Sequence, residues 1–193
     1  MRTQYFTKVG DKGKSFLGKK EIQKSSLIFD VLGGLDLLNS WVGFARAEAE
    51  KKGQKKKGKI ELSKLLFELQ EFLFIAQAEA AAFGVSYGNY VGKKILGGHI
   101  RYFEDVIFVI DRSVPPLTKF VVPGGCELSA RIDLARTTAR AIERDIVRFG
   151  KKEKVSAEFL MFFNRLSSYL FALARYANWE AGAKERHPSY KTK

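Results

Sequence analysis

Two residue types that build many metal, redox and disulfide sites are nearly missing from this chain. Its 193 residues include one cysteine, Cys126, and two histidines, His99 and His187. One cysteine excludes an intrachain disulfide and a CxxC zinc or redox site, and two histidines leave too few ligands for a histidine-rich metal centre. We find no signal-peptide pattern, and no apolar run approaches the ~20 residues that span a bilayer. These absences favour a reducing, aqueous compartment, and we expect a cytoplasmic protein without a membrane partner.

Acidic side chains are also few. The chain has 21 Asp and Glu against 34 Lys and Arg, which gives a formal net charge of +13. This excess favours a polyanionic partner, and charge alone leaves open a nucleic acid, an anionic membrane surface or a phosphorylated ligand. The lysine-rich run at 51–59 lacks the interleaved aromatics that stack on bases, and is typical of a solvated turn.

Apolar residues recur at spacings of three and four over most of the chain, which predicts helices. Hydrophobic residues make up 46% of the sequence. We expect helices at about 26–50, 60–83, 100–110, 127–149 and 156–181. The first 26 residues are dense in glycine and lysine, and we expect a loop there without helix or strand. The sequence therefore predicts an all-α five-helix bundle at 27–183, with an N-terminal loop region at 1–26 and a polar tail at 184–193.

A charged edge accompanies the apolar seam of the helix expected at 127–149. At 100° per residue, Arg136, Arg140 and Glu143 fall within about 60° of one another beside the buried stripe. Arginines at such a boundary commonly reach water and form surface ion pairs worth at most ~1 kcal/mol. A guanidinium group also fits phosphate and carboxylate oxygens, so an anion site is the alternative. The spacing leaves both open.

A narrow polar stripe crosses the helix expected at 156–181, which is otherwise apolar on nearly all sides. Asn164, Ser168 and Arg175 form this stripe at spacings of four and seven. An unpaired buried polar group costs ~1–3 kcal/mol, so these side chains need partners. An interhelical hydrogen-bond network and a cavity or subunit interface account for them equally well.

The N-terminal loop contains the parts of a phosphate cradle: glycines, hydroxyls, ammonium groups and free backbone N–H groups. Gly13-Lys14-Ser15 resembles the end of a Walker A motif. The complete motif needs a glycine five residues before Gly13, where this chain has Lys8, and it follows a strand. The loop is therefore no P-loop, and its composition alone is also that of an ordinary solvated loop.

Five ordered blocks cover nearly the whole chain: Thr7-Lys8-x-Gly10-Asp11-x-Gly13, Gly34-x-Asp36-x-Leu38-Asn39-Ser40-x-x-Gly43, Phe120-x-x-Pro123-Gly124-Gly125, Ala135-Arg136-Thr137 with Glu143-Arg144, and Asn164-Arg165-Leu166-Ser167. Together they resemble the propanediol-utilisation type of ATP:cob(I)alamin adenosyltransferase. The resemblance implies a homotrimer of five-helix bundles with an active site at each subunit interface. There MgATP and cob(I)alamin would react to give adenosylcobalamin and triphosphate.

The resemblance also implies a role for each candidate site residue. The triphosphate of ATP would be held by Thr7, Lys8, Gly10, Asp11, Gly13, Lys14, Ser15 and Lys24. Arg140, Glu143 and Asn164 would complete the nucleotide site from the neighbouring subunit. Arg136 would pair with Asp36, and Phe120 would occupy the lower face of the corrin. The candidate catalytic set is then Asp36, Arg136, Arg140 and Glu143, with Mg²⁺ arriving on ATP.

Some positions depart from the residues that are usual in that family. Leu37, Ala141 and Ser168 stand where an acidic residue, an arginine and an aspartate are usual, and Ile22 and Asp133 replace an arginine and a histidine. Adenosyl transfer is the main expectation, with a reductase and an adenosylcobalamin-dependent enzyme as further partners. A cobalamin carrier or sensor on the same fold is the alternative. A basic nucleic-acid-binding helical module, favoured only by the net charge, is the distant third.

Overall fold

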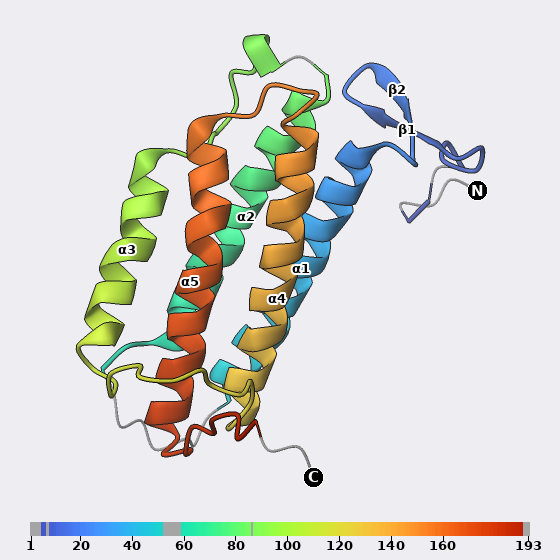
Figure 1. Cartoon of the computed structure of the whole chain (residues 1–193). Helices are drawn as coiled ribbons and strands as arrows, with labels where there is room; N and C mark the ends of the chain where they lie inside the picture. Colours follow the sequence, from blue (N-terminus) through green and yellow to red (C-terminus); the bar gives the residue numbers. More distant parts are fainter. Residues whose placement is uncertain (1–4, 7, 52–58, 86, 191–193) are drawn as a thin grey trace.

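The helical periodicity of the sequence is realised as five long helices (Figure 1). The computed structural model describes residues 5, 6, 8–51, 59–85 and 87–190. In these residues the α-helices are α1 (Leu27–Ala49), α2 (Leu62–Phe83), α3 (Gly97–Asp111), α4 (Glu127–Phe149) and α5 (Ala157–Glu180). A short 3₁₀ helix, η1 (Tyr87–Asn89), lies in the connection between α2 and α3. The predicted all-α five-helix bundle is confirmed.

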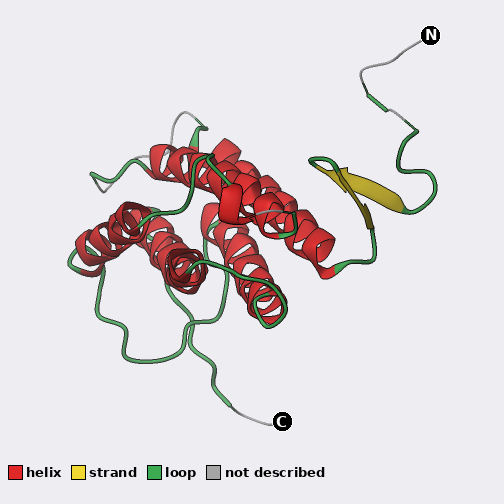
Figure 2. Cartoon of the chain, turned by 90° about the horizontal axis from the view of Figure 1, so that it is seen from above, coloured by secondary structure: helices red, strands yellow, loops and turns green. Residues whose placement is uncertain are grey.

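The bundle is built around α4, which packs against both α1 and α5. Helix α1 also packs against α2, and α3 packs against α5, so the five helices share one long axis (Figures 1 and 2). The predicted seams form the core: Leu35 from α1, Ile132 from α4 and Phe163 from α5 are each fully buried. Because α4 and α5 lie side by side, their polar edges meet along one side of the bundle.

Helix α1 is long and apolar enough, by length and composition alone, to cross a membrane. The core helix of a soluble protein meets the same criterion. In this structure the apolar face of α1, which includes Leu35 and Leu38, is buried against the neighbouring helices. Packing inside the bundle therefore accounts for the buried face of α1, whereas Leu37 and Phe44 of the same helix are exposed.

The N-terminal region contains a β-hairpin, so the prediction of a loop without strands is wrong. Strands β1 (Lys14–Leu17) and β2 (Lys20–Gln23) pair antiparallel, with Lys14 opposite Gln23 and Leu17 opposite Lys20. Two residues connect them, and the first, Gly18, has φ of 59°. Glycine at that position suits a tight hairpin turn, so glycine here permits the strands that its density seemed to exclude. The hairpin stands to one side of the bundle (Figures 1 and 2).

Two adjacent glycines of α1 meet different surroundings, and their substitutions are expected to have opposite effects. A Cβ at Gly34 would lie 2.8 Å from Cγ1 of the buried Ile142 on α4, whereas a Cβ at Gly33 meets no atom of the described chain within 4 Å. Gly33→Ala is expected to raise the free energy of unfolding by about 0.5–1 kcal/mol through helix propensity. Gly34→Ala is expected to lower it by about 1 kcal/mol, because overpacking of α4 outweighs that gain. Denaturant unfolding of both variants measures the difference, and equal shifts would contradict the close α1–α4 approach.

Candidate active site

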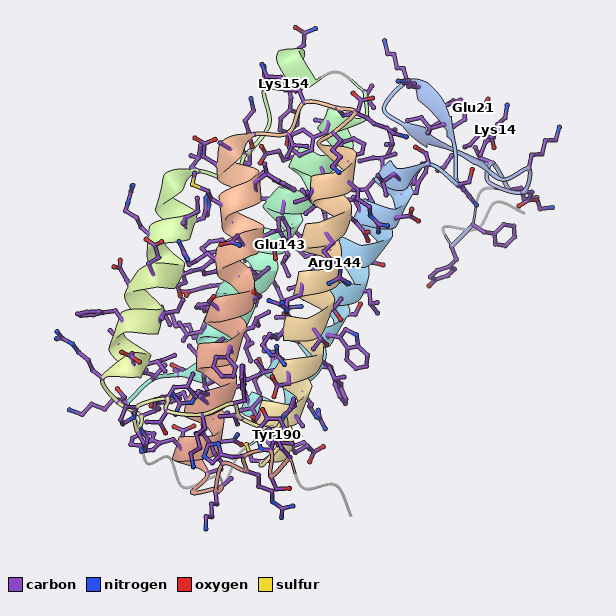
Figure 3. All side chains as sticks on the ribbon, viewed as in Figure 1. Lys14, Glu21, Glu143, Arg144, Lys154 and Tyr190 are labelled. Carbon is purple, nitrogen blue, oxygen red and sulfur yellow. The ribbon has the colours of Figure 1, made fainter. Side chains whose placement is uncertain are left out.

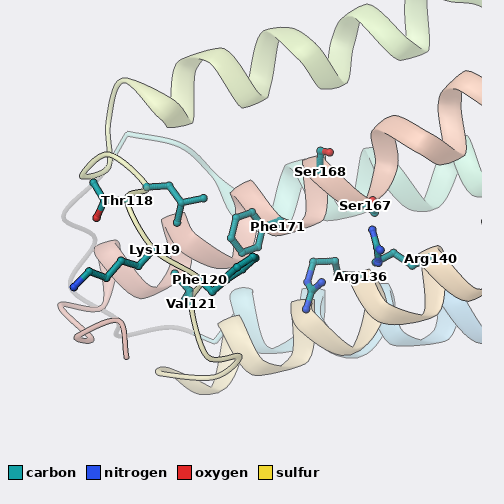
Figure 4. Close-up of a pocket in the computed structure, with 10 residues that line it drawn as sticks. Thr118, Lys119, Phe120, Val121, Arg136, Arg140, Ser167, Ser168 and Phe171 are labelled. Carbon is teal, nitrogen blue, oxygen red and sulfur yellow. The ribbon is translucent and has the colours of Figure 1, made fainter. Parts of the chain in front are cut away.

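A pocket of about 670 Å³ opens between α4, α5 and the loop that precedes α4 (Figure 4). The loop supplies Phe120 and its neighbours, α4 supplies Arg136 and Arg140, and α5 supplies Ser168 and Phe171. The complete lining is Leu117, Thr118, Lys119, Phe120, Val121, Arg136, Arg140, Ser167, Ser168 and Phe171. The structure thus brings three of the predicted site residues, Phe120, Arg136 and Arg140, to one cavity.

The pocket has an aromatic end and a basic end. The rings of Phe120 and Phe171 lie together, and the guanidinium groups of Arg136 and Arg140 lie further along α4 (Figure 4). Phe120 is 79% exposed and lines the pocket together with Phe171, so its ring is open to a ligand there. An aromatic wall beside two guanidinium groups, of which that of Arg136 is paired with Asp133, suits a ligand with a flat apolar part and an anionic part.

Arg136 is held by its own helix. Its Nε donates to Oδ1 of Asp133 at 2.6 Å, and its guanidinium carbon lies 5.9 Å from the centre of the Phe171 ring. Asp133, which replaces a histidine that is usual in the family, therefore orients Arg136 along the pocket wall. Asp36 is exposed on α1, and Arg136 contacts Asp133 within the described chain. The predicted pairing of Arg136 with Asp36 stays a prediction.

Glu143 and Asn164 join α4 to α5 beside the pocket. Nδ2 of Asn164 donates to Oε1 of Glu143 at 3.0 Å. Arg140 precedes Glu143 by three residues on α4 and is exposed, so the three residues that the resemblance assigns to the nucleotide lie on one side of the bundle. The predicted polar stripe of α5 is not one buried network, because Asn164 and Ser168 are exposed and only Arg175 is buried.

The N-terminal phosphate-cradle residues gather in one loop. The N–H of Asp11 donates to the Lys8 carbonyl at 3.3 Å, and that of Gly13 donates to the Gly10 carbonyl at 3.2 Å. Lys8 has φ of 62° and Gly13 has φ of 73°, so the backbone turns twice over six residues. Thr7 lies outside the described residues. Because both N–H groups are bonded within the loop, they shape it, and an anion there would be held by the lysines and by other backbone N–H groups.

Two lysines of this region bind oxygens of the chain itself. Nζ of Lys24 donates to the Gly10 carbonyl at 3.0 Å, and a Cβ at residue 10 would lie 2.7 Å from that Nζ. Glycine at position 10 therefore lets the ammonium group approach the loop. Nζ of Lys14 on β1 pairs with Glu21 on β2 at 2.8 Å, while Ser15 follows it on the same strand. Both ammonium groups are partly exposed and remain at the surface of the cradle.

The cradle and the pocket lie on different parts of one chain. Lys14 and Glu21 lie on the hairpin beside the start of α1, whereas Glu143 lies midway along the bundle (Figure 3). One chain therefore does not bring the predicted phosphate-binding loop to Arg140, Glu143 and Asn164. Phe171, Ser167 and the segment 117–119 also line the pocket, but the sequence does not predict this. Their positions on α5 and in the loop do not differ from those of ordinary packing residues.

Cysteine and histidine do not form a reactive centre here. No group of three His, Cys, Asp or Glu side chains comes together as metal ligands within the described residues. Cys126 caps the start of α4 by accepting from the Ser129 N–H, and burial raises the pKa of its thiol. A half-buried thiol with a raised pKa is unreactive near neutral pH, in line with a packing role. His99 accepts from the Leu96 N–H at the start of α3.

The chain is similar to proteins of known family and structure. The family described as cobalamin adenosyltransferase matches residues 5–177. Corrinoid adenosyltransferase of Bacillus subtilis is 34% identical over 92% of this chain and 88% of its own length, and human corrinoid adenosyltransferase is 33% identical over 94% and 71%. A variant of the PduO-type ATP:corrinoid adenosyltransferase from Lactobacillus reuteri, solved with cobalamin and ATP, matches with a TM-score of 0.85 and 31% identity over 96% of this chain and 99% of that one. The chain therefore belongs to the cobalamin adenosyltransferase family.

Proposed function

We propose that this protein transfers the 5′-deoxyadenosyl group of ATP to cob(I)alamin and releases triphosphate. The supporting observation is the pocket that places Phe120 with Arg136 and Arg140. Its aromatic end offers a surface for a corrin, and its basic end offers charge for a phosphate chain. The neighbour from Lactobacillus reuteri was solved with both cobalamin and ATP. A shared pocket is what a reaction between two bound substrates requires.

In the proposed reaction, the electron pair of Co(I) attacks C5′ of ATP. The cobalt–carbon bond forms as the C5′–O bond breaks, cobalt passes formally from Co(I) to Co(III), and triphosphate leaves with the bonding electrons. Negative charge therefore grows on the phosphate chain in the transition state. The guanidinium group of Arg140 and the ammonium group of Lys8 would stabilise that charge, and preorganised donors of this kind are often the largest catalytic term.

Phe120 would lie beneath the corrin and keep donor ligands away from the lower face of cobalt. Removing the lower axial ligand makes Co(II) easier to reduce to the nucleophilic Co(I). Phe120→Ala is expected to lower the rate roughly tenfold when cob(II)alamin is reduced in the assay, since water then reaches the lower face. With cobalamin fully reduced beforehand, we expect a smaller loss. Both rates are followed by the absorbance of adenosylcobalamin, and equal losses in the two assays would contradict this role.

Mg²⁺ is expected to enter with ATP and not through a dedicated protein site. The described residues contain no cluster of three potential ligands, and among the carboxylates near the two halves of the nucleotide site, Glu21 and Asp133 are already paired with Lys14 and Arg136. Mg²⁺ is commonly held by one or two carboxylates, substrate phosphates and waters, so this sparse set fits the ion. Bound there, Mg²⁺ would neutralise charge on the leaving triphosphate.

A homotrimer with a site at each interface would unite the two halves of the nucleotide site. The hairpin packs on one end of its own bundle through Leu17 and Ile22, and exposed apolar residues Leu37, Phe44 and Leu134 lie on α1 and α4. Such a surface is typical of a protein–protein interface. We propose that each hairpin reaches the α4–α5 side of a neighbour, in a cytoplasmic enzyme served by a separate reductase and supplying an adenosylcobalamin-dependent enzyme. A mass measurement in solution tests the trimer.

The function is tested by incubating purified protein with MgATP and chemically reduced cobalamin. Adenosylcobalamin and triphosphate are expected in equal amounts, and neither without ATP. A cobalamin carrier is the second candidate, because Ser168 lines the pocket where the family usually has aspartate. Tight cobalamin binding without product at any ATP concentration would favour that carrier. Binding to DNA with a log–log salt slope of about 0.9 per phosphate contacted would instead favour the nucleic-acid module.

A further inference from the structure

The loop that carries Phe120 has no regular secondary structure, yet it is held at both ends by α5. Nη2 of Arg175 donates to the Pro115 carbonyl at 2.8 Å near the start of the loop. Asn178 holds the other end: its Nδ2 donates to the Gly124 carbonyl at 2.9 Å, and its Oδ1 accepts from the Cys126 N–H at 2.9 Å. Arg175 and Asn178 are 7% and 3% exposed. Two buried side chains, one turn apart, thus fix the ends of the loop.

The C-terminal segment crosses the middle of the same loop. The N–H of Val122 donates to the Arg186 carbonyl at 2.8 Å. Nδ1 of His187 lies 2.8 Å from the Phe120 carbonyl, and because a carbonyl only accepts, this nitrogen carries the proton and donates. The chain after α5 therefore bonds to the residue that bears the exposed ring and to the residue two positions later.

An ion pair ties this segment to α5. Oε1 of Glu185 accepts from Nε of Arg175 at 2.8 Å, and Oε2 accepts from Nη2 at 3.1 Å. The Arg175 side chain is 7% exposed, so its charge needs this carboxylate. The N–H of Ala183 also donates to the Asn178 carbonyl at 2.9 Å. The polar tail expected from the sequence is therefore docked on the bundle up to residue 187, through the ion pair of Glu185 with the buried Arg175.

We propose that residues 183–187 form a strap that sets the position of Phe120 in the pocket, with Glu185 and His187 as positioning residues for cobalamin. The Phe120 side chain is 79% exposed, so its place follows from the backbone at 120–122, which the strap holds. The strap also leaves the guanidinium groups of Arg136 and Arg140 untouched. This inference rests on the proposed function only in taking the ligand over Phe120 to be cobalamin.

The test uses the double variant Glu185→Gln/His187→Ala, which weakens the ion pair and removes the donor to Phe120. We expect the KM for cobalamin to rise roughly tenfold and the KM for ATP to change less than about twofold, because the hydrogen bond to the Phe120 carbonyl is lost and the ion pair that docks the strap on α5 is weakened. Lys184→Ala is the matched control, an exposed strap residue that lines other surface hollows and not this pocket. General destabilisation would change both KM values together, so the split separates positioning from folding.

Amide hydrogen exchange provides a readout that does not depend on activity. In the natural protein the Val122 N–H is bonded to Arg186 and is expected to exchange slowly, and in the double variant it is expected to exchange at least about tenfold faster. Slow exchange at Val122 in the double variant, or an unchanged KM for cobalamin beside normal turnover, would overturn the strap while leaving the adenosyltransferase standing. If Val122 exchanges faster in the double variant but the natural protein forms no adenosylcobalamin, the strap is supported and the proposed function is wrong.

Discussion

Replacing Arg140 with alanine is expected to reduce adenosylcobalamin formation by roughly 10³-fold, as removal of a preorganised donor to a charged transition state does in other enzymes. Arg140 is exposed at the pocket, so the truncation removes charge and not core packing. We expect an unchanged midpoint of unfolding and cobalamin binding within about twofold of the natural protein, because Phe120 is left in place. Single-turnover rates at saturating MgATP measure the loss.

Arg148→Ala is the control for this substitution. Arg148 lies on the same helix two turns further on, is exposed, and pairs with Asp145 outside the pocket. Removing it changes the net charge by the same amount, and we expect activity to stay within about twofold because surface ion pairs contribute little. An equal loss in both variants would show that overall charge, and not the position of Arg140, controls the rate.

Phe103→Ala is expected to have the largest effect on stability, lowering the free energy of unfolding by about 3–5 kcal/mol. Phe103 on α3 is fully buried, and its ring stacks on Tyr169 with ring centres 4.4 Å apart and lies 4.9 Å from Phe162. Both of those residues belong to α5, so the ring fills the contact between α3 and α5. Guanidinium unfolding at a fixed protein concentration measures the change, because the stability of an oligomer depends on concentration.

Phe108→Ala on the same helix removes a ring of the same size from the surface. Phe108 is 56% exposed, with the Arg112 guanidinium 4.1 Å from its ring centre. Its loss is expected to cost less than about 1 kcal/mol, the value of a surface cation–π contact. A similar cost for Phe103 and Phe108 would mean that α3 does not pack on α5 as described.

The helices were predictable because their signals are local. The seam of α4 and the glycine that follows it predict 127–149, and the observed helix has those bounds. The sequence does not predict the hairpin, because a high density of glycine argues against strands. Gly18 instead provides the positive φ of a two-residue turn, and the four residues on each side pair as strands. Whether a glycine breaks a strand or forms the turn of a hairpin depends on its φ angle, which the composition does not reveal.

The candidate site divides in the same way. Helical spacing placed Arg136, Arg140 and Glu143 together on α4, and the structure confirms that grouping. The approach of Phe120 to those arginines depends on tertiary packing of an irregular loop, so only the resemblance to a family predicted it. The polar stripe of α5 divides between the two alternatives, because Asn164 bonds to α4 and Ser168 lines the pocket, while only Arg175 is buried. Arg175 is buried against Glu185, a partner that lies beyond the end of α5 and gives no periodic signal.

The hairpin lies away from Glu143 of its own chain (Figure 3), and this has a consequence for how defects combine. If each copy lends its hairpin to the next around a closed ring, every copy is both donor and acceptor. A copy with a damaged Lys8 then still presents an intact Arg140, and a copy with a damaged Arg140 still presents an intact Lys8. Mixing two such inactive proteins would regenerate working sites by complementation, and dilution below the point of dissociation would silence even the natural protein.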